Sequence, residues 1–347
     1  MTDYKNLKLI ATSSPHIRAA ENTRSIMLDV IIAMMPALIW AIVKFGFRAL
    51  TLTAVSVVGC MFFEWGYRKL MKKPQSVNDL SAAVTGILLA FVCPVNMPYW
   101  MILVGDFFAI VVVKQLFGGI GKNFVNPALA ARAFMSAAYA AYMTTWAVPS
   151  TLRSVVDATT MATPLSYLNN GEALPEYFNY LNMFLGGIPG SIGEVSALAL
   201  LIGGAYLLIR KVITWRIPVT FIGTVAVLTL VFGHEGYGNV EWMLYNVLSG
   251  GLILGAFFMA TDYSTSPVNL KGQLLYGVGC GAVTVLIRYF GSYPEGVSYA
   301  ILVMNCCTWA IDKGFRPRQF GMTKEDIKAR KAAEKAAKKA AKERVAE

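Results

Sequence analysis

Charged side chains are scarce in this chain. Asp, Glu, Lys and Arg make up 15% of the 347 residues, whereas 56% are hydrophobic. A water-soluble domain cannot hide that much apolar surface in a core, so the composition excludes a purely soluble protein and predicts one whose solvent includes lipid. Because a bilayer offers no partners to free backbone N–H and C=O groups, the spanning segments are expected to be helices of about 20 residues.

Histidine and cysteine are also scarce. The two histidines, His16 and His234, fall in expected loops and are not spaced as ligands, which argues against a haem held by paired histidines. The five cysteines form no CxxC motif and no Cys/His cluster, so we expect no metal or iron–sulfur site within this chain alone. The thiols are expected to fill space within helices.

Ten apolar runs have the length and composition of spanning segments. They cover residues 26–44, 49–67, 82–95, 98–113, 127–147, 195–209, 217–232, 243–259, 274–289 and 297–311. The sequence therefore predicts an all-α integral membrane protein with about ten transmembrane helices. We expect no cleavable signal peptide, because the first 24 residues are polar and of mixed charge.

Lysine and arginine are unevenly distributed around the predicted helices. Cytoplasmic loops retain these residues, so the more basic side marks the cytoplasm. With a cytoplasmic N-terminus, the inner side holds Arg68, Lys69, Lys72, Lys73, Lys114, Lys122, Arg132, Arg210, Lys211, Arg216 and Lys271. The outer loops hold only Lys44, Arg48, Arg153 and Arg288. Both termini are therefore predicted to be cytoplasmic.

The net charge of +11 has the same origin. Most of the excess lies beside predicted helix ends or in the tail from Lys313 to Arg344, so topology accounts for it and no nucleic-acid partner is expected. The tail contains Ala, Lys and Glu without an apolar stripe. We expect a solvated helix there, close to anionic membrane lipid.

The runs divide into two sets of five around a polar loop. The segments "LSAAVTGILLAFVCPVNMP" and "VLSGGLILGAFFMATDYSTSP" both end in a break, which indicates a duplication. Because five is odd, the second copy would insert upside down. We predict two inverted five-helix repeats at 1–147 and 191–315, an outer loop at 148–190 and a basic cytoplasmic tail at 316–347, an architecture that resembles urea channels. The competing explanation is chance occurrence of Gly and Pro in membrane helices.

Breaks and polar residues within the spans indicate possible pathways. In an inverted repeat, the interrupted segments near Pro94 and Pro267 would face each other near the midplane. Asp106 is surrounded by apolar neighbours in "VGDFFAIVVVK", and a carboxylate inside lipid is costly unless it has a task. Asn126, before Pro127, could expose backbone carbonyls to a cation. We therefore predict an ion path that includes Asp106 and Asn126.

Two other carboxylates have simpler explanations. Asp29 lies one turn inside the first predicted helix and can reach headgroup water, whereas Glu64 can pair with Arg68 four residues later. We interpret both as structural.

The outer loop is rich in hydroxyl groups. Asp157, Thr159, Thr160 and Thr163 lie within seven residues, and Pro164 follows directly. On local sequence alone this is a helix start, with Thr163 as the N-cap and Pro164 in the first helical position. Loops of this length in a compact protein usually have a task.

Three segments carry a resemblance to a known family. They are "SSPHIRAAENTRSIMLDVIIAMMPALI", "GGIGKNFVNPALAARAF" and "ATDYSTSPV". With them the chain resembles, over its full length, the D subunit of Rnf ion-translocating oxidoreductases and the related B subunit of sodium-pumping NADH:quinone reductases. The short region before "SSPHIR" favours the first of these, because the B subunit usually has a longer N-terminal region.

The resemblance implies a covalent flavin. In that family a segment close to D-x-x-[ST]-G-A-T carries FMN, joined through its phosphate to the last threonine. Here the implied attachment site is Thr163, and the flavin-binding segment includes Asp157, Thr160 and Ala162. Asp157 is implied to help a flavin transferase bind. Met161 stands where the family pattern usually has Gly, which restricts the close backbone approach that Gly allows.

The resemblance also implies a function. It is that of a membrane electron-transfer subunit in a bacterial cytoplasmic (inner) membrane, working with Rnf subunits A, B, C, E and G. Such a complex couples ferredoxin oxidation and NAD reduction to export of Na⁺ or H⁺. Riboflavin is a second flavin of the wider family, with no residue signature in this sequence.

Fold alone does not fix function, so two rivals stand beside this interpretation. One is a passive solute channel or transporter of the urea-channel type. The other is a scaffold that only holds neighbouring subunits. Flavin bound to Thr163 would distinguish electron transfer from both.

Overall fold

The computed structural model of the protein describes residues 21–150, 160–170, 172, 174–175, 177–233, 236–291, 295–315 and 321. Asp157, Arg153, both histidines and nearly all of the basic tail lie outside the described residues. Helices dominate the described ranges, in which the only strands are two of two residues each. The predicted helical character is confirmed.

The first half of the chain is a series of helices that precede the outer loop. They are α1 (Thr23–Phe45), α2 (Phe47–Leu70), the 3₁₀ turn η2 (Val77–Asp79), α3 (Ser81–Phe91), α4 (Tyr99–Phe107), the π-helix η3 (Phe108–Gln115), α5 (Pro127–Ala138) and α6 (Ala140–Met143). The outer loop contributes β1 (Trp146–Ala147), β2 (Thr160–Met161), α7 (Pro164–Asn169) and α8 (Tyr180–Leu185).

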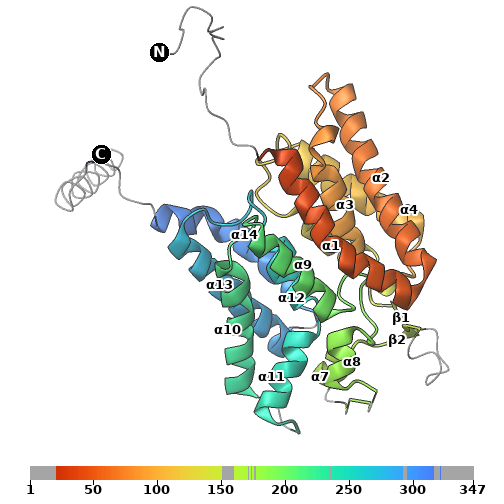
Figure 1. Cartoon of the computed structure of the whole chain (residues 1–347), viewed down its shortest axis with the longest axis vertical. Coiled ribbons are helices and arrows are strands. Elements are labelled where there is room, and N and C mark those ends of the chain that lie inside the picture. Colours follow the sequence, from red (N-terminus) through yellow and green to blue (C-terminus); the bar gives the residue numbers. More distant parts are fainter. Residues whose placement is uncertain are drawn as a thin grey trace, which may run out of the picture.

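The second half is also a series of helices. It contains α9 (Ala197–Ile209), α10 (Arg216–Phe232), α11 (Asn239–Leu248), α12 (Leu252–Leu254), the π-helix η4 (Gly255–Met259), α13 (Leu270–Phe290) and α14 (Val297–Gly314). Figure 1 shows α1 to α4 on one side of the molecule and α9 to α14 on the other. The elements β1, β2, α7 and α8 lie at the end opposite the first turn of α1 (Figure 1).

Every predicted apolar run contains helix, but the helices differ in length. Among the described residues, α1, α2 and α13 are long and apolar enough to cross a membrane. A fourth span results if α11 and the α12–η4 segment, bent by 61° at their junction, are counted as one. The apolar helices α3, α9 and α10 are shorter. These findings support a multi-pass membrane protein.

Local sequence explains where the principal helices begin. Asn22 caps α1 by accepting a hydrogen bond from the backbone N–H of Ser25 at 2.9 Å, and α1 ends at Gly46, whose φ of +81° favours glycine. Asn126 caps α5 in the same way, accepting from the N–H of Ala128 at 3.0 Å, with Pro127 in the first turn.

The halves meet through antiparallel helices. Near the start of α1, Asp29 accepts from the hydroxyl of Tyr206 at 2.8 Å and pairs with Arg210 at 3.2 Å; Tyr206 lies near the end of α9 and Arg210 directly after it. The partner of Asp29 is therefore a cation of the other half, rather than headgroup water as we expected. Gly203 of α9 lies against the backbone carbonyl of Ala33 in α1, so the two helices approach closely.

Within each half, two of the longer helical segments run parallel. In the first half, Thr51 contacts Tyr99 at 2.8 Å at one end, and Arg68 donates to Gln115 at 3.3 Å at the other. In the second half, α10 and α13 are also parallel. The first halves of the two helices pack against each other, and so do their last turns. A Cβ on Gly281 of α13 would lie 2.6 Å from Thr224 of α10, and Tyr289 near the end of α13 donates to the carbonyl of Gly233 at 2.9 Å.

One expectation about the breaks is wrong: the segments near Pro94 and Pro267 do not face each other. Arg48 in the first turn of α2 donates to the carbonyl of Val95 at 2.9 Å, whereas the N–H of Val268 donates to Asp312 in the last turn of α14 at 3.4 Å. These contacts lie at opposite ends of the bundle. The reason is that the helical segment of the second half is interrupted before Pro267, at Gly250 and Gly251. Positive φ values of 71° and 65° turn the chain there.

Cation–aromatic pairs mark helix ends. Each places a Lys or Arg over an aromatic ring within 5.8 Å, and they are Lys44/Trp40, Arg48/Tyr99, Lys69/Trp65, Lys73/Tyr67, Arg216/Trp215 and Lys313/Trp309. Amphipathic aromatic rings and basic residues collect where a membrane meets water. The pairs are thus placed where headgroups would be.

The contact between Gly203 and Ala33 predicts a steric test. Gly203→Val would force a side chain against the backbone of α1 and is expected to destabilise the protein by about 1–3 kcal/mol. Gly223→Val is the matched control, because no atom lies within 4 Å of a Cβ at that helical position. Thermal unfolding in detergent measures both. Equal melting temperatures for the two variants would contradict the close α1–α9 contact.

Candidate functional site

The structure places Thr163 at the junction between the short sheet and α7. Strands β1 and β2 pair antiparallel, with Ala147 opposite Thr160, and the chain then turns into α7. Thr163 is extended, and its Oγ1 accepts from the N–H of Ser166 at 3.3 Å, so the predicted N-cap is confirmed. The Thr163 side chain is only 5% exposed, whereas Thr160 and Ala162 are exposed.

A pocket lies next to Thr163, and two residues close to Thr163 in the chain contribute to its wall. Ala162 and Ser166 line this outer pocket, and the Oγ of Ser166 lies 3.0 Å from Oγ1 of Thr163. Its other walls include Arg132, Met143, Trp146, Glu295, Ser298 and Tyr299. A hydroxyl, a cation and aromatic walls thus converge beside the predicted attachment site, and this donor set fits a phosphate joined to a flat aromatic ring.

Aromatic side chains pack around the remainder of the outer loop. Tyr177 donates to the sulfur of Met161 at 3.7 Å and packs edge-on against Phe178, with ring centroids 4.6 Å apart. Burial raises the pKa of the Tyr177 phenol, and Tyr167 raises it further, so Tyr177 stays neutral at physiological pH. Met161, the departure from the family pattern, is therefore held against the loop by a tyrosine.

Arg132 is a buried charge in the outer pocket. It belongs to α5, not to an inner loop as our count of basic residues supposed, and it is 8% exposed. Its Nη1 donates to the hydroxyl of Ser298 at 2.8 Å and lies 3.6 Å from Glu194, while Nη2 pairs with Glu295. The ion pairs offset the cost of removing these charges from water.

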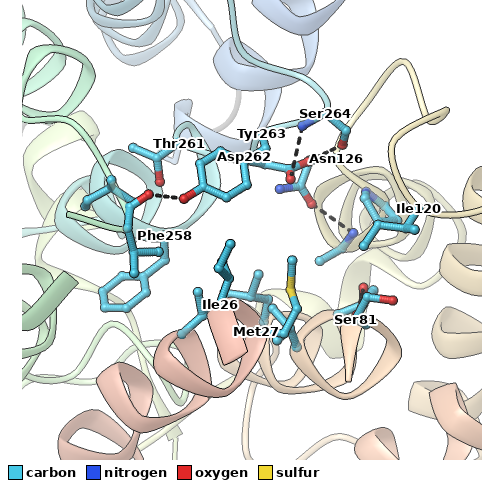
Figure 2. Close-up of a pocket in the computed structure, with 18 of the residues that line it drawn as sticks. Ile26, Met27, Ser81, Ile120, Asn126, Phe258, Thr261, Asp262, Tyr263 and Ser264 are labelled. Carbon is cyan, nitrogen blue, oxygen red and sulfur yellow. Dashed lines mark hydrogen bonds between the residues drawn. The ribbon is translucent and has the colours of Figure 1, made fainter. Parts of the chain in front are cut away.

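A second pocket lies near the opposite end of the bundle, beside the first turns of α1. Figure 2 shows Ile26 and Met27 of α1 on one side of this inner pocket, with Asn126 and Asp262 across it. Asn126 Nδ2 donates to the carbonyl of Met259 at 3.3 Å, so the predicted residue joins α5 to η4.

The inner pocket lies against both π-helices. Lys114 from η3 and Phe257 and Phe258 from η4 contribute to its walls. Asp262, which follows η4, accepts from the hydroxyl of Ser264 at 2.9 Å and from that of Thr265 at 3.2 Å. π-Helical turns occur frequently at functional sites. Sequence reasoning missed this pocket, because π-helix leaves no periodic signal distinct from α-helix.

Asp106 of α4 is fully buried and faces α2. Its Oδ1 accepts from the hydroxyl of Ser56 at 2.6 Å and from the thiol of Cys60 at 3.2 Å. Its Oδ2 has no hydrogen-bond partner among the described residues. This oxygen packs against Gly59, where an added Cβ would lie only 2.7 Å from it. Asp106 and Asn126 share no hydrogen-bond partner in this part of the chain, so no direct link joins the two predicted ion-path residues.

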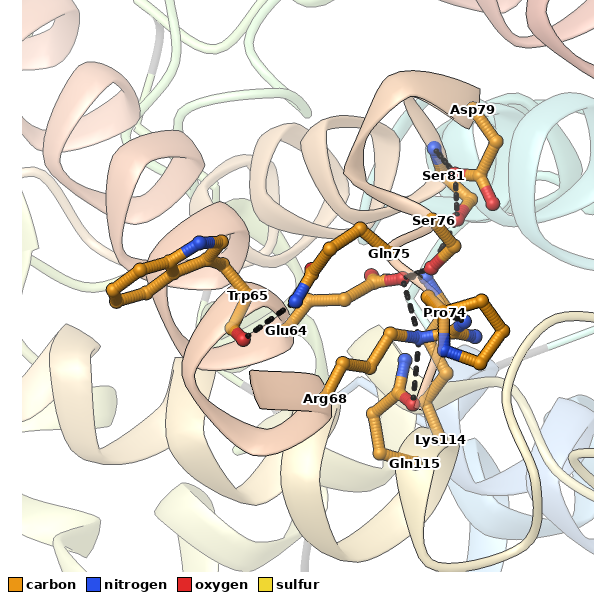
Figure 3. A network of polar contacts seen from close by, with 10 residues as sticks. All are labelled: Glu64, Trp65, Arg68, Pro74, Gln75, Ser76, Asp79, Ser81, Lys114 and Gln115. Atoms are coloured by element: carbon orange, nitrogen blue, oxygen red, sulfur yellow. Dashed lines mark hydrogen bonds and ion pairs between the residues drawn. The ribbon is translucent and has the colours of Figure 1, made fainter. Parts of the chain in front are cut away.

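A separate polar network holds the inner ends of α2, α3 and η3 together (Figure 3). Glu64 pairs with Arg68 at 3.8 Å, as predicted, but its shorter contact is with Lys114 at 2.9 Å. Lys114 also donates to the hydroxyl of Ser81 at 2.6 Å, and Ser76 donates to Glu64. The interpretation of Glu64 as structural fits this network, although its principal partner comes from another helix.

No group of three or more His, Cys, Asp or Glu side chains suited to a metal ion is found where the chain is described. The polar centres are instead the outer pocket with Thr163 and Arg132, the inner pocket with Asn126, and the isolated carboxylate of Asp106.

Apolar spanning helices with charges and pockets buried between them define a multi-pass membrane protein. The chain belongs to the NQR2, RnfD, RnfE family, which it matches over residues 10–321. The resemblance inferred from sequence motifs is thereby confirmed.

Individual relatives share nearly the whole chain. It is 50% identical over 323 residues to the D subunit of the Na(+)-translocating ferredoxin:NAD(+) oxidoreductase complex of Acetobacterium woodii, an alignment that covers 92% of this chain and 97% of the relative. It is 42% identical over 324 residues to the D subunit of the proton-translocating ferredoxin:NAD(+) oxidoreductase complex of Clostridium ljungdahlii, covering 91% and 97%. The D subunit of the ion-translocating oxidoreductase complex of Actinobacillus succinogenes is 34% identical over 345 residues, covering 89% and 97%.

The network around Glu64 predicts a loss of stability. Lys114→Met leaves Glu64 without its closest cation and is expected to destabilise the protein by about 3–5 kcal/mol. Adding Glu64→Gln should restore part of this loss, because the unpaired charge is then removed. Lys122→Met is the control, since Lys122 is exposed. Thermal unfolding in detergent measures all variants, and equal stability of Lys114→Met and Lys122→Met would refute the pairing.

Proposed function

We propose that this chain is the membrane electron-transfer subunit of an ion-translocating ferredoxin:NAD⁺ oxidoreductase of the Rnf type, with FMN joined covalently to Thr163. The observation that carries the proposal is the outer pocket, because a pocket lined by a buried cation and aromatic side chains adjoins the threonine that matches the family motif. The names of the relatives support the assignment to a complex. The expected partners are Rnf subunits A, B, C, E and G, and a flavin transferase during maturation.

Thr163 would be the anchor of the flavin. Its Oγ1 would form the phosphoester, and the hydroxyl of Ser166, 3.0 Å from Oγ1, and the guanidinium of Arg132 line the adjoining pocket. When bound, the flavin supplies one-electron redox chemistry, and the protein supplies position and electrostatics. Thr160 and Ala162 belong to the strand end that presents the anchor, and Asp157 is assigned to transferase recognition from the family motif alone.

An outer position for Thr163 follows from the proposed topology. The elements next to Thr163 lie at the end opposite the start of α1 (Figure 1), which supports a cytoplasmic N-terminus with the flavin outside. The antiparallel α1–α9 pair and the parallel α2–α4 and α10–α13 pairs support ten spans in two inverted repeats. We place the protein in the bacterial cytoplasmic membrane, with both termini in the cytoplasm.

The inner pocket is the place we assign to the second flavin, riboflavin. Apolar walls from Ile26, Met27 and Phe258 face polar groups of Asn126 and Asp262. This combination suits an uncharged ring with hydrogen-bonding edges.

Ion movement is assigned to Asp106, with Asn126 as a second contributor. A buried carboxylate with one unpartnered oxygen can exchange a proton or a small cation with its surroundings. The relatives in Acetobacterium woodii and Clostridium ljungdahlii are named for Na⁺ and for protons respectively, and either ion can be carried by a membrane carboxylate.

Flavin attachment is tested by fluorescence of the denatured chain. Protein made in cells with an active flavin transferase should give a fluorescent band on a denaturing gel under ultraviolet light. Thr163→Val should give a dark band, because the acceptor oxygen is gone. Thr145→Val is the matched control, since Thr145 is an exposed hydroxyl of the same outer region. A wild-type band without fluorescence would contradict the electron-transfer proposal and favour the passive channel or the scaffold.

The role of Asp106 is tested in the complete complex reconstituted in liposomes. Asp106→Asn keeps the shape of the side chain but removes its charge, so we expect most ion transport driven by ferredoxin:NAD⁺ oxidoreduction to be lost. Asp29→Asn, a carboxylate at the bundle end, should transport normally. Radioactive Na⁺ uptake and a pH-sensitive dye together detect either ion. Unchanged transport by Asp106→Asn would remove this residue from the path.

A further inference from the structure

Four buried charges lie together beside the outer pocket. Arg132 contacts Glu194 and Glu295, and all three side chains are at most 10% exposed. Arg288 of α13, also buried, donates to the backbone carbonyl of Asn246 at 2.6 Å. The two arginines and two glutamates make the group neutral overall. The free-energy cost of removing these charges from water is therefore offset within the protein, without a bound ion.

The members of this group are held by different parts of the chain. Arg132 comes from α5, and Glu295 precedes α14. Glu194 lies in the segment before α9, which is fixed because the N–H of Gly193 donates to the carbonyl of Phe91 at 2.8 Å. A purely structural role, tying α5 to the second half, would explain these contacts.

The walls of the outer pocket point to more than a structural role. Arg132 and Glu295 line the pocket, whereas Glu194 and Arg288 do not. The pocket therefore presents a donor beside an acceptor at one wall, and the hydroxyl of Ser298, 2.8 Å from Arg132, adds a third polar group. Trp146 and Met143 supply apolar walls, and the anchor hydroxyl of Thr163 adjoins through Ser166.

This arrangement matches one edge of a flavin ring. The pyrimidine edge of isoalloxazine carries an N–H donor between two carbonyl acceptors, so it needs an acceptor flanked by donors. We propose that the outer pocket holds the isoalloxazine ring of the flavin on Thr163, with Glu295 accepting from the ring N–H and Arg132 donating to the adjacent carbonyl. The inference rests on the proposed function and deepens it.

The positive charge of Arg132 then sets the reduction potential of that flavin. An electron taken up by the ring adds negative charge near the pyrimidine edge, and a fixed cation there stabilises the reduced form relative to the oxidised form. Glu295 acts in the opposite direction, because its negative charge disfavours an added electron. The two residues should therefore shift the potential with opposite signs when each is neutralised.

The experiment is a spectroscopic redox titration of the purified, flavin-loaded complex, with dithionite as the electron donor and mediators present. Arg132→Gln should lower the ratio of reduced to oxidised Thr163-linked flavin at a fixed potential about tenfold, which is 59 mV for a one-electron couple. Glu295→Gln should raise the same ratio. Arg132→Lys keeps the charge and should give a smaller shift than Arg132→Gln.

Arg48→Gln is the matched control. Arg48 lies at the same end of the bundle and donates to backbone carbonyls, at 2.9 Å for Val95, but it does not line the outer pocket. Its potential should equal that of the wild type. If Arg132→Gln does not fold, Arg132→Lys and Glu295→Gln decide the question.

Gel fluorescence distinguishes a failure of flavin attachment from a failure of the ring-binding assignment. A dark wild-type band overturns covalent flavin and with it the proposed function. Fluorescent Arg132 and Glu295 variants with wild-type potentials leave the proposed function intact and overturn the present inference, because the group is then structural. Opposite shifts in fluorescent variants support it, since a structural loss alone would not reverse sign between a cation and an anion.

Discussion

A charge inside a lipid-embedded bundle has no water to stabilise it, and this constraint governs where polar residues occur in the chain. Lys114 meets Glu64, and Arg132 meets Glu194 and Glu295, each from a different element. Ion pairs of this kind connect helices that apolar contacts alone would leave free to slide. Lys114 lines the inner pocket, and Arg132 and Glu295 line the outer pocket, so ion-paired residues form part of both walls.

Asp106 departs from that rule. Its partners are a hydroxyl and a thiol rather than a cation, and one of its oxygens has no hydrogen-bond partner within the described chain. Asp106 lies so close to Gly59 that a larger side chain at position 59 would clash with the carboxylate. A carboxylate kept uncompensated in such a place costs stability, and a functional task is the usual reason that such a cost persists.

Sequence reasoning succeeded where a signal was local or periodic. Apolar runs predicted the helices, and the Thr163–Pro164 pair predicted the start of α7. It failed where tertiary packing decides. Arg132 looked like a loop cation, because a helix with one basic residue and many alanines gives no sign of which partners will surround it. The Gly250–Gly251 break was likewise displaced in our prediction toward Pro267, because proline is the stronger local signal of a helix end.

Helix α5 belongs to both pockets. Its first residues, Pro127 and Ala128, line the inner pocket, and Arg132 and Ser136 line the outer pocket. From Ala128 to Arg132 the helix rises about 6 Å, at 1.5 Å per residue. A single rigid element therefore sets the separation of the two cavities, and a one-residue insertion in α5 would rotate one set of lining residues away from its cavity by about 100° while leaving the other in place.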